Sequence, residues 1–233
     1  MQTYINFGLI DVVGKRYVEN SYMTVENGVI RSVGSMASLT QEQKQGAVDL
    51  SGKTVMPGMF NCHIHALSSP IAAPESLNWE TSGMFALRGL RHLQQQLQSG
   101  VTFVRDMNGR KLAEVDLKNA LNQGLFVGPN YYIARQCLCM TGGHGCNTGR
   151  ECDGAVDCKK AAREQIKGGA DFVKIMATGG VNSDTRPEFS QLDLEEMTAA
   201  INEAHRAGKK TATHAHGKAG IKTAVLAGID SVE

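Results

Sequence analysis

The 233-residue sequence predicts an α/β protein in which a small β-rich domain precedes a larger domain built on a parallel sheet. Two observations lead to this prediction. Up to residue 56, apolar residues occur in short strand-like runs separated by turn residues. From residue 57 to residue 233, short apolar runs alternate with longer segments of helical pattern, which is typical of repeated strand–helix units.

Residues 1–56 are predicted to form hairpins. Asn27-Gly28 stands between two apolar runs, and this dipeptide in such a place is the strongest short-range signal for a β-hairpin. Another short apolar run precedes Gly52. We therefore expect a small β-sandwich domain with strands at residues 4–11, 21–26, 29–33 and 47–50.

Residues 57–233 carry clear helix start and stop signals. Asp193 stands three residues before Glu196, as in a capping box. Glycines occupy expected C-terminal cap positions at residues 100, 124, 168 and 208. The predicted strands of this part are 54–60, 101–105, 131–134, 172–176 and 211–215, and the predicted helices are 83–98, 112–122, 157–168, 193–207 and 218–227.

This alternation indicates either a (β/α)8 barrel of the TIM type or a doubly wound sheet. A barrel takes about 250 residues, whereas 176 residues follow residue 57 in this sequence of 233. Five strand–helix units are visible, and residues 230–233 are similar to the opening of a sixth strand. We therefore expect an incomplete barrel, truncated at its C-terminal side.

The composition excludes several classes of function. A formal net charge of +1, without a basic block, predicts binding neither to nucleic acid nor to an anionic membrane. No apolar run approaches the ~20 residues of a membrane-spanning helix. The N-terminus lacks the pattern of a signal peptide, so a cytoplasmic location is expected.

Five of the six cysteines lie close together in the sequence. Zinc knuckles show paired CxxC spacing, and the only close pair here is CxC, so reduced thiols without a role are favoured over a structural metal site. A disulfide in this segment is the alternative if the protein is exported. The five are Cys137, Cys139, Cys146, Cys152 and Cys158.

Two histidine pairs and one lysine carry the chemistry. His63 and His65 follow an apolar run, and residues two apart on a strand point the same way, so the pair is suited to bind a metal. His214 and His216 repeat the pattern at the end of another predicted strand. Lys174 lies inside an apolar strand before a glycine-rich loop, and a buried ammonium needs a partner or altered chemistry.

These features have ordinary interpretations as well. An isolated HxH pair is often one packed and one solvated histidine, and a strand lysine often extends its ammonium to solvent. All three features are predicted at the C-terminal ends of parallel strands, where barrel active sites lie. Together they predict a metal centre better than each does alone.

The sequence resembles the amidohydrolase superfamily at several motifs. Residues 55–65 are similar to its first-strand signature, and the β-rich segment before them is similar to its N-terminal sandwich. The remaining motifs resemble the imidazolonepropionase-like branch, which contains Xaa-Pro dipeptidases and related carboxypeptidases. They are residues 174–180, 203–208, 214–217 and 227–233.

The resemblance implies a site with two divalent metal ions, with zinc expected. His63 and His65 would bind one metal, Lys174 as a carboxylated lysine would bridge both, and His214 would bind the second. His216 is expected to contact substrate, although the roles of His214 and His216 could be exchanged.

A loop after the third strand implies a further substrate contact. His144 in the segment 140–145 is a candidate partner for a substrate carboxylate or carbonyl, and a solvent-exposed loop histidine is the alternative. Arg105, Arg135 and Arg186 are predicted near strand ends or in loops and could also bind a carboxylate.

The sequence departs from the family pattern at two places. Asn61 stands where the family usually has an aspartate. The family's sixth-strand histidine ligand and its eighth-strand aspartate, the general base, are expected beyond Glu233, so no catalytic base is assigned here.

The implied function is metal-dependent hydrolysis of a C–N amide bond in a small molecule. Xaa-Pro or Xaa-Arg/Lys dipeptides fit the branch, and residues 1–233 alone are expected to be inactive. A cyclic amide substrate and a non-catalytic barrel scaffold are the alternatives. The sequence does not decide between a monomer and a homo-oligomer.

Overall fold

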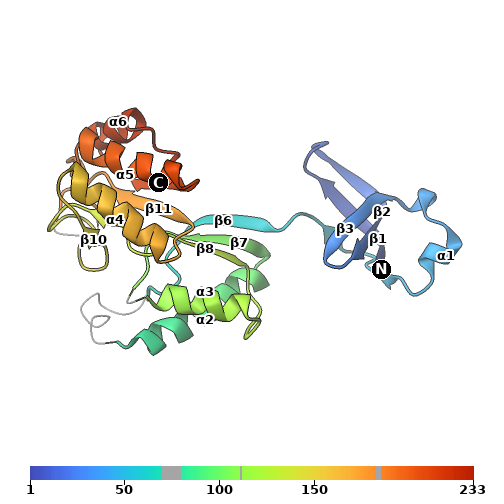
Figure 1. Cartoon of the computed structure of the whole chain (residues 1–233). Coiled ribbons are helices and arrows are strands. Elements are labelled where there is room, and N and C mark those ends of the chain that lie inside the picture. The colour runs from blue at the N-terminus through green and yellow to red at the C-terminus, as the bar shows by residue number, and fades with distance from the viewer. Residues whose placement is uncertain (70–79, 111, 182–184) are drawn as a thin grey trace. The chain divides into compact units, whose positions relative to one another are not determined.

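The structure is a computed structural model of the chain, and it describes residues 1–69, 80–110, 112–181 and 185–233 (Figure 1). The chain divides into two compact units, Met1–Gly58 and Met59–Glu233. Each unit is described by itself below.

The first unit is a single mixed sheet. Strands β1, β2 and β3 pair antiparallel, while β4 and β5 pair parallel to β1. Asn27 and Gly28 both have positive φ, 52° and 74°, as the predicted two-residue hairpin turn requires. The β-rich prediction is confirmed, and a second sandwich layer stays a prediction. The elements are β1 (Gln2–Asp11), β2 (Arg16–Glu26), β3 (Val29–Ser35), η1 (Met36–Ser38), α1 (Gln41–Lys44), β4 (Val48–Asp49) and β5 (Thr54–Val55).

The second unit alternates strands and helices. Its strands form two parallel sheets, ordered β6-β7-β8 and β10-β9-β11-β12-β13. The strands are β6 (Met59–Ile64), β7 (Val101–Asp106), β8 (Asn130–Ile133), β9 (Leu138–Cys139), β10 (Arg150–Glu151), β11 (Phe172–Met176), β12 (Lys210–His214) and β13 (Ser231–Val232). The helices are α2 (Ser82–Gln98), α3 (Ala113–Asn122), α4 (Ala155–Lys167), α5 (Leu194–Arg206) and α6 (Lys218–Leu226).

A kink after β8 separates the two sheets. Arg135 has φ 60°, a left-handed conformation that non-glycine residues rarely adopt. Before the kink β8 pairs with β7, and after it β9 pairs with β11. The Arg135 carbonyl accepts a hydrogen bond from Gly109 N at 2.7 Å, which holds the kink against the end of β7.

The predicted strand–helix alternation is present, with shifts at the ends of elements. The expected strand 54–60 is two strands, because β5 joins the first unit and β6 the second. Gly168 is the C-terminal cap of α4, as predicted; its φ is −81°, and the left-handed residue is the next one, Gly169, with φ 96°.

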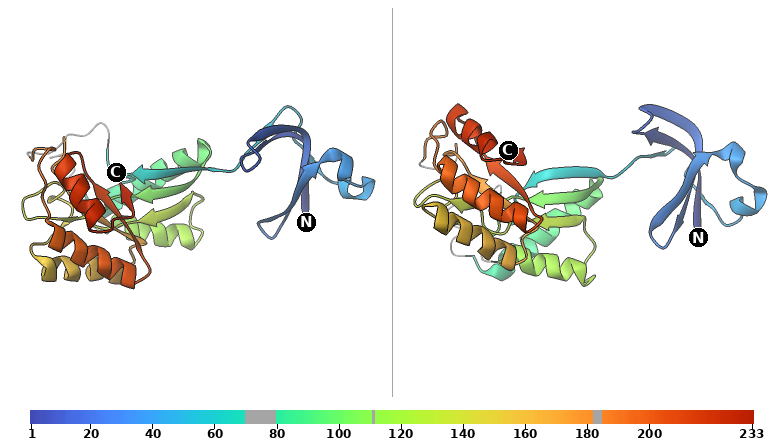
Figure 2. Two further views of the ribbon diagram at one scale, coloured as in Figure 1. Left: turned by 90° about the horizontal axis from the view of Figure 1, so that it is seen from above. Right: turned by 45° about the horizontal axis from the view of Figure 1, so that its top comes forward.

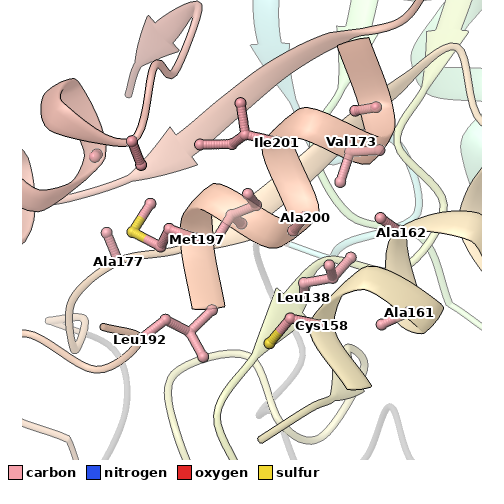
Figure 3. Close-up of a cluster of buried hydrophobic side chains, with 14 of the residues drawn as sticks. Leu138, Cys158, Ala161, Ala162, Val173, Ala177, Leu192, Met197, Ala200 and Ile201 are labelled. Atoms are coloured by element: carbon pink, nitrogen blue, oxygen red, sulfur yellow. The ribbon is translucent and has the colours of Figure 1, made fainter. Parts of the chain in front are cut away.

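The main core lies between α4, α5 and the larger sheet, and Figure 2 shows the two helices side by side. Alanines on the facing helix surfaces allow close approach, and larger side chains fill the space beside them (Figure 3). This packing holds β11 rigidly from one side. Its buried members include Leu138, Ala161, Ala162, Val173, Met197, Ala200 and Ile201.

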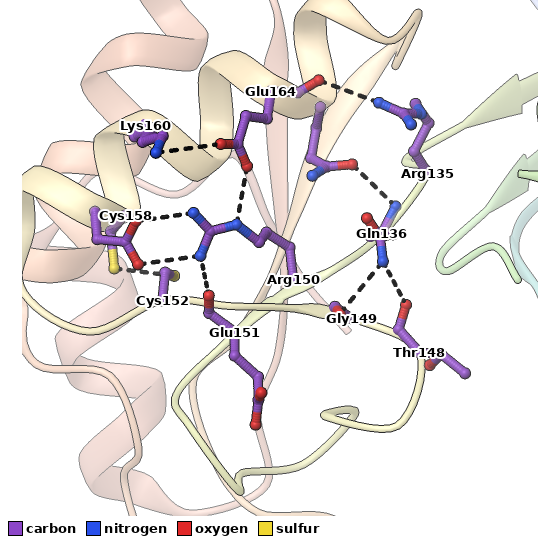
Figure 4. A network of polar contacts seen from close by, with 12 residues as sticks. Arg135, Gln136, Thr148, Gly149, Arg150, Glu151, Cys152, Cys158, Lys160 and Glu164 are labelled. Atoms are coloured by element: carbon purple, nitrogen blue, oxygen red, sulfur yellow. Dashed lines mark hydrogen bonds and ion pairs between the residues drawn. The ribbon is translucent and has the colours of Figure 1, made fainter. Parts of the chain in front are cut away.

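Arg150 ties β10 to α4 (Figure 4). Its guanidinium donates to both carboxylate oxygens of Asp157, at 2.8 and 3.0 Å, and to Glu164 at 2.9 Å. Beside it the Cys152 and Cys158 sulfurs lie 3.1 Å apart. All six cysteines are free thiols.

The capping box of α5 provides a test of local stability. Asp193 accepts a hydrogen bond from Glu196 N at 2.8 Å, and the Glu196 carboxylate accepts one from Asp193 N at 2.8 Å. We expect Asp193→Ala to lower the free energy of unfolding by about 1 kcal/mol. Urea unfolding measures this, and Glu195→Ala in the same exposed turn is the control. Equal losses in both variants would contradict a role for the cap.

Candidate functional site

Lys174 occupies the centre of the candidate site. It is the middle residue of β11, whose five residues are all buried, and only 1% of it is exposed. Its Nζ makes no hydrogen bond within the described part of the chain. Burial lowers the pKa of Lys174 to about 8, although the negative charge of Glu233 opposes this shift.

Four histidines lie within electrostatic reach of Lys174. Burial, together with neighbouring positive charges that include Lys174, lowers the pKa of His63 and His144. The same causes lower the pKa of His65 and of His214 to about 4. All four rings are therefore neutral near pH 7, which is the form that binds metal ions.

The first histidine pair lies at a β-bulge. Asn61 pairs with Val104 but Ile64 pairs with Asp106, so β6 carries one extra residue in the segment that includes His63. His65 follows the last residue of β6, and its ring centroid is 5.4 Å from that of His63. The rings are neighbours as expected, but a bulge and a turn place them rather than regular strand alternation.

The second pair forms a row with a loop histidine. His214 ends β12, and its ring centroid lies 4.7 Å from His216 and 4.5 Å from His144. The His214 Nε2 lies 3.3 Å from the Gly179 carbonyl oxygen. A Cβ on Gly180 would come within 2.3 Å of the His144 ring, so this loop needs glycine for close approach. The structure thus brings His144, His214 and His216 together.

Two carboxylates at the site were not predicted from the sequence. Glu233 lies 3.2 Å from His63 Nδ1 and forms an ion pair with Arg105. Asp106 is buried at the end of β7, with 1% exposure, and accepts hydrogen bonds from Tyr131 and from the backbone next to His65.

The three arginines considered for substrate binding have partners within the chain. Arg105 binds Glu233, and Arg186 donates to Glu188 at 2.5 Å. The Arg135 guanidinium donates to the Glu164 carbonyl at 3.1 Å. A pocket of about 360 Å³ borders the site at His65.

No three His, Cys, Asp or Glu side chains are placed to hold a metal ion in the ranges that the structure describes. His63, His65 and His214 each interact electrostatically with Lys174, whose amine is not a metal ligand in its charged form. Within the same described ranges, no helix is long and apolar enough to cross a membrane.

Residues 54–233 match the model of the amidohydrolase family. The chain belongs to this family. The predicted superfamily is therefore confirmed, and the larger unit shares the TIM-barrel type of fold found among its structural neighbours.

The curated relatives include the ochratoxinase of Aspergillus niger, which is 31% identical over 264 residues that cover 99% of this chain and 54% of that protein. The chain thus spans about half the length of the ochratoxinases it matches. An imidazolonepropionase of Clostridium tetani is 30% identical over 69 residues, which is 28% of this chain and 16% of that protein.

Solved structures show the same similarity. A Xaa-Pro dipeptidase with bound methionine in its active site superimposes with a TM-score of 0.86 at 26% identity. A prolidase complexed with N-methylphosphonate-L-proline superimposes with a TM-score of 0.88 at 29% identity. In both cases the match covers 99% of this chain and 60% of the other.

Proposed function

We propose that this chain supplies most of a binuclear metal centre that hydrolyses a C–N amide bond. In this proposal His63 and His65 would hold one divalent ion, His214 would hold a second, and Lys174 as a carbamate would be a ligand of both. Nitrogen and carboxylate donors suit zinc, among other divalent ions. Two such ions lower the pKa of a water molecule and polarise the scissile carbonyl when they are bound.

The unpartnered Nζ of Lys174 is the observation that supports this proposal most. Burial lowers the amine pKa to about 8, so part of the amine is neutral near pH 7. A neutral amine adds to the carbon of CO2, forms an N–C bond and releases one proton. The resulting carbamate carries one negative charge shared by two oxygens among neutral histidines, a donor set that fits two divalent ions.

The substrate that we propose is a dipeptide or N-acyl amino acid. The names of the relatives support this class, because they include a Xaa-Pro dipeptidase and a prolidase with a proline-containing ligand. His144 and His216 lie beside His214 and would contact the substrate near the metals. A cyclic amide is less supported, since the imidazolonepropionase matches only 28% of the chain.

We propose that catalysis needs more of the family's length than these 233 residues. The ochratoxinase is matched over 54% of its length and the Xaa-Pro dipeptidase over 60%. The unmatched part would supply a further histidine ligand, the aspartate base, the remaining barrel strands and the second sandwich layer. Residues 1–233 alone are therefore expected to bind metal without hydrolysing dipeptides.

Metal analysis tests the proposal. The chain is loaded with Zn²⁺ or Co²⁺ in bicarbonate buffer, desalted and measured for bound metal. We expect up to two ions per chain, with His63→Ala losing at least one and His205→Ala, an exposed histidine paired with Asp230, losing none. A chain that binds no metal would favour the scaffold alternative, and full Xaa-Pro hydrolysis by residues 1–233 would contradict the need for further residues.

A further inference from the structure

The backbone on both sides of His65 is held by the end of β7. His65 itself follows β6, where strand pairing has ended. Its preceding residue, Ile64, accepts a hydrogen bond from Met107 N at 3.0 Å. Its following residue, Ala66, donates its N–H to the Asp106 carboxylate at 3.2 Å. The bond to Ile64 joins two backbone groups, whereas the bond from Ala66 depends on the Asp106 side chain.

The Asp106 carboxylate is itself held firmly. The Tyr131 hydroxyl donates to the same oxygen, Oδ2, at 2.6 Å, and Asn108 N lies 3.4 Å from Oδ1. Asp106 is 1% exposed and Tyr131 is 3% exposed, so water does not compete for these bonds. Tyr131 on β8 thus holds the carboxylate of Asp106 on β7, and this carboxylate in turn holds the backbone that follows β6.

This support is placed where the strand geometry is irregular. The bulge in β6 frees the segment around His63 from regular pairing, and His65 lies in the turn beyond it. Regular strand pairing does not fix the orientation of a side chain on such a segment. Metal ligands, however, need precise orientation by the groups around them. The Asn108 backbone also hydrogen-bonds His65.

We propose that Asp106, supported by Tyr131, is the positioning residue that fixes His65 for metal binding. This inference rests on the proposed function. Asp106 touches neither metal nor substrate in this account and acts through the backbone at Ala66 and at Asn108. Asp171 is the control, because its carboxylate likewise accepts from a backbone N–H, that of Ile133 at 2.8 Å, which does not adjoin His65.

The first experiment measures His65 without metal. The full chain carries ¹⁵N-labelled histidine, and long-range ¹H–¹⁵N spectra report the tautomer and surroundings of each ring at a fixed pH. Asp106→Ala is expected to shift the His65 ring signals and mix its tautomers, with a smaller change in Tyr131→Phe. Asp171→Asn should leave the His65 signals unchanged, and His205 is an internal reference.

The second experiment measures the affinity for Co²⁺ by competition with a chelator. Loss of a group that orients a ligand typically weakens metal binding about 10–100-fold, which we expect for Asp106→Ala. Asp106→Asn keeps one acceptor oxygen for Ala66 N and should recover part of that loss. Tyr131→Phe keeps the carboxylate and is expected to weaken binding less than Asp106→Ala does.

The outcomes separate this inference from the proposed function. If the unmodified chain binds no Co²⁺, the proposed function fails, and the His65 spectra alone decide the positioning role. If Asp106→Ala leaves both the spectra and the affinity unchanged, the inference is wrong. It is also wrong if Asp171→Asn causes the same changes, because the effect would then be general loss of stability.

Discussion

Lys174→Met is expected to stabilise the metal-free chain while it removes metal binding. Burial, opposed in part by the charge of Glu233, lowers the pKa of Lys174 from its ordinary 10.5 to about 8, so at pH 7 the folded state keeps a charge that the unfolded state holds more favourably. That difference corresponds to about 3 kcal/mol. Methionine has a similar length and no charge, so it fills the position without this cost.

The measurement is urea unfolding at pH 7 in CO2-free buffer without metal. Lys118→Met is the matched control, because Lys118 Nζ lies 2.5 and 2.6 Å from the two Asp171 carboxylate oxygens. Removing this paired lysine is expected to lower the free energy of unfolding by up to about 1 kcal/mol. The two substitutions should therefore change stability in opposite directions.

The same variant tests the chemistry. After addition of ¹³C-bicarbonate and Zn²⁺, the unmodified chain should show a carbamate carbon signal and retain metal, whereas Lys174→Met should show neither. Lower stability in Lys174→Met would mean that the amine has a favourable partner in the folded chain. A carbamate signal that persists in the variant would assign the modification to another lysine.

Local sequence patterns indicated which residues of each strand are candidates for the site. His63, His65 and His214 are candidates because each lies at or near the end of an apolar run, and parallel strands bring such ends together, whereas Lys174 is a candidate because it lies inside such a run. The hairpin at Asn27-Gly28 and the capping box at Asp193 are likewise determined by residues a few positions apart.

Long-range contacts explain what the sequence did not show. Asp106 is 40 residues from Ala66 and 25 from Tyr131, and nothing in the run 101–106 marks its carboxylate as buried. Arg135 carries no signal for a left-handed conformation, since asparagine or glycine is the usual choice there. The bulge in β6 depends on its pairing with β7, which exists only after folding.

Asp106→Asn is expected to change how stability depends on pH. Burial, opposed by the hydrogen bonds from Tyr131 and the backbone, raises the pKa of Asp106 from 3.8 to about 7. Between these values the folded state holds a proton that the unfolded state has lost. The folded state therefore binds more protons, and the free energy of unfolding falls as pH rises from about 4 to about 7, by up to about 4 kcal/mol.

Asparagine does not titrate in this range. The difference in unfolding free energy between the unmodified chain and Asp106→Asn should therefore change by up to about 4 kcal/mol between about pH 4 and about pH 7. Asp230 is the control of opposite sign. Burial raises its pKa, but hydrogen bonds from Lys210, His205 and Thr211 outweigh this and hold the pKa below its ordinary value. Its stabilisation is present at neutral pH and is lost as the pH falls, so Asp230→Asn should cost more stability at pH 7 than in acid.

The two carboxylates therefore give a test that a general loss of packing cannot imitate. A cavity or a lost contact lowers stability by a similar amount at every pH, whereas these substitutions change the slope in opposite directions. If the Asp106→Asn difference is flat from pH 4 to pH 7, Asp106 is ionised throughout that range in the folded chain. The Ala66 N–H and the Tyr131 hydroxyl would then donate to a charged carboxylate and hold the segment at His65 more strongly.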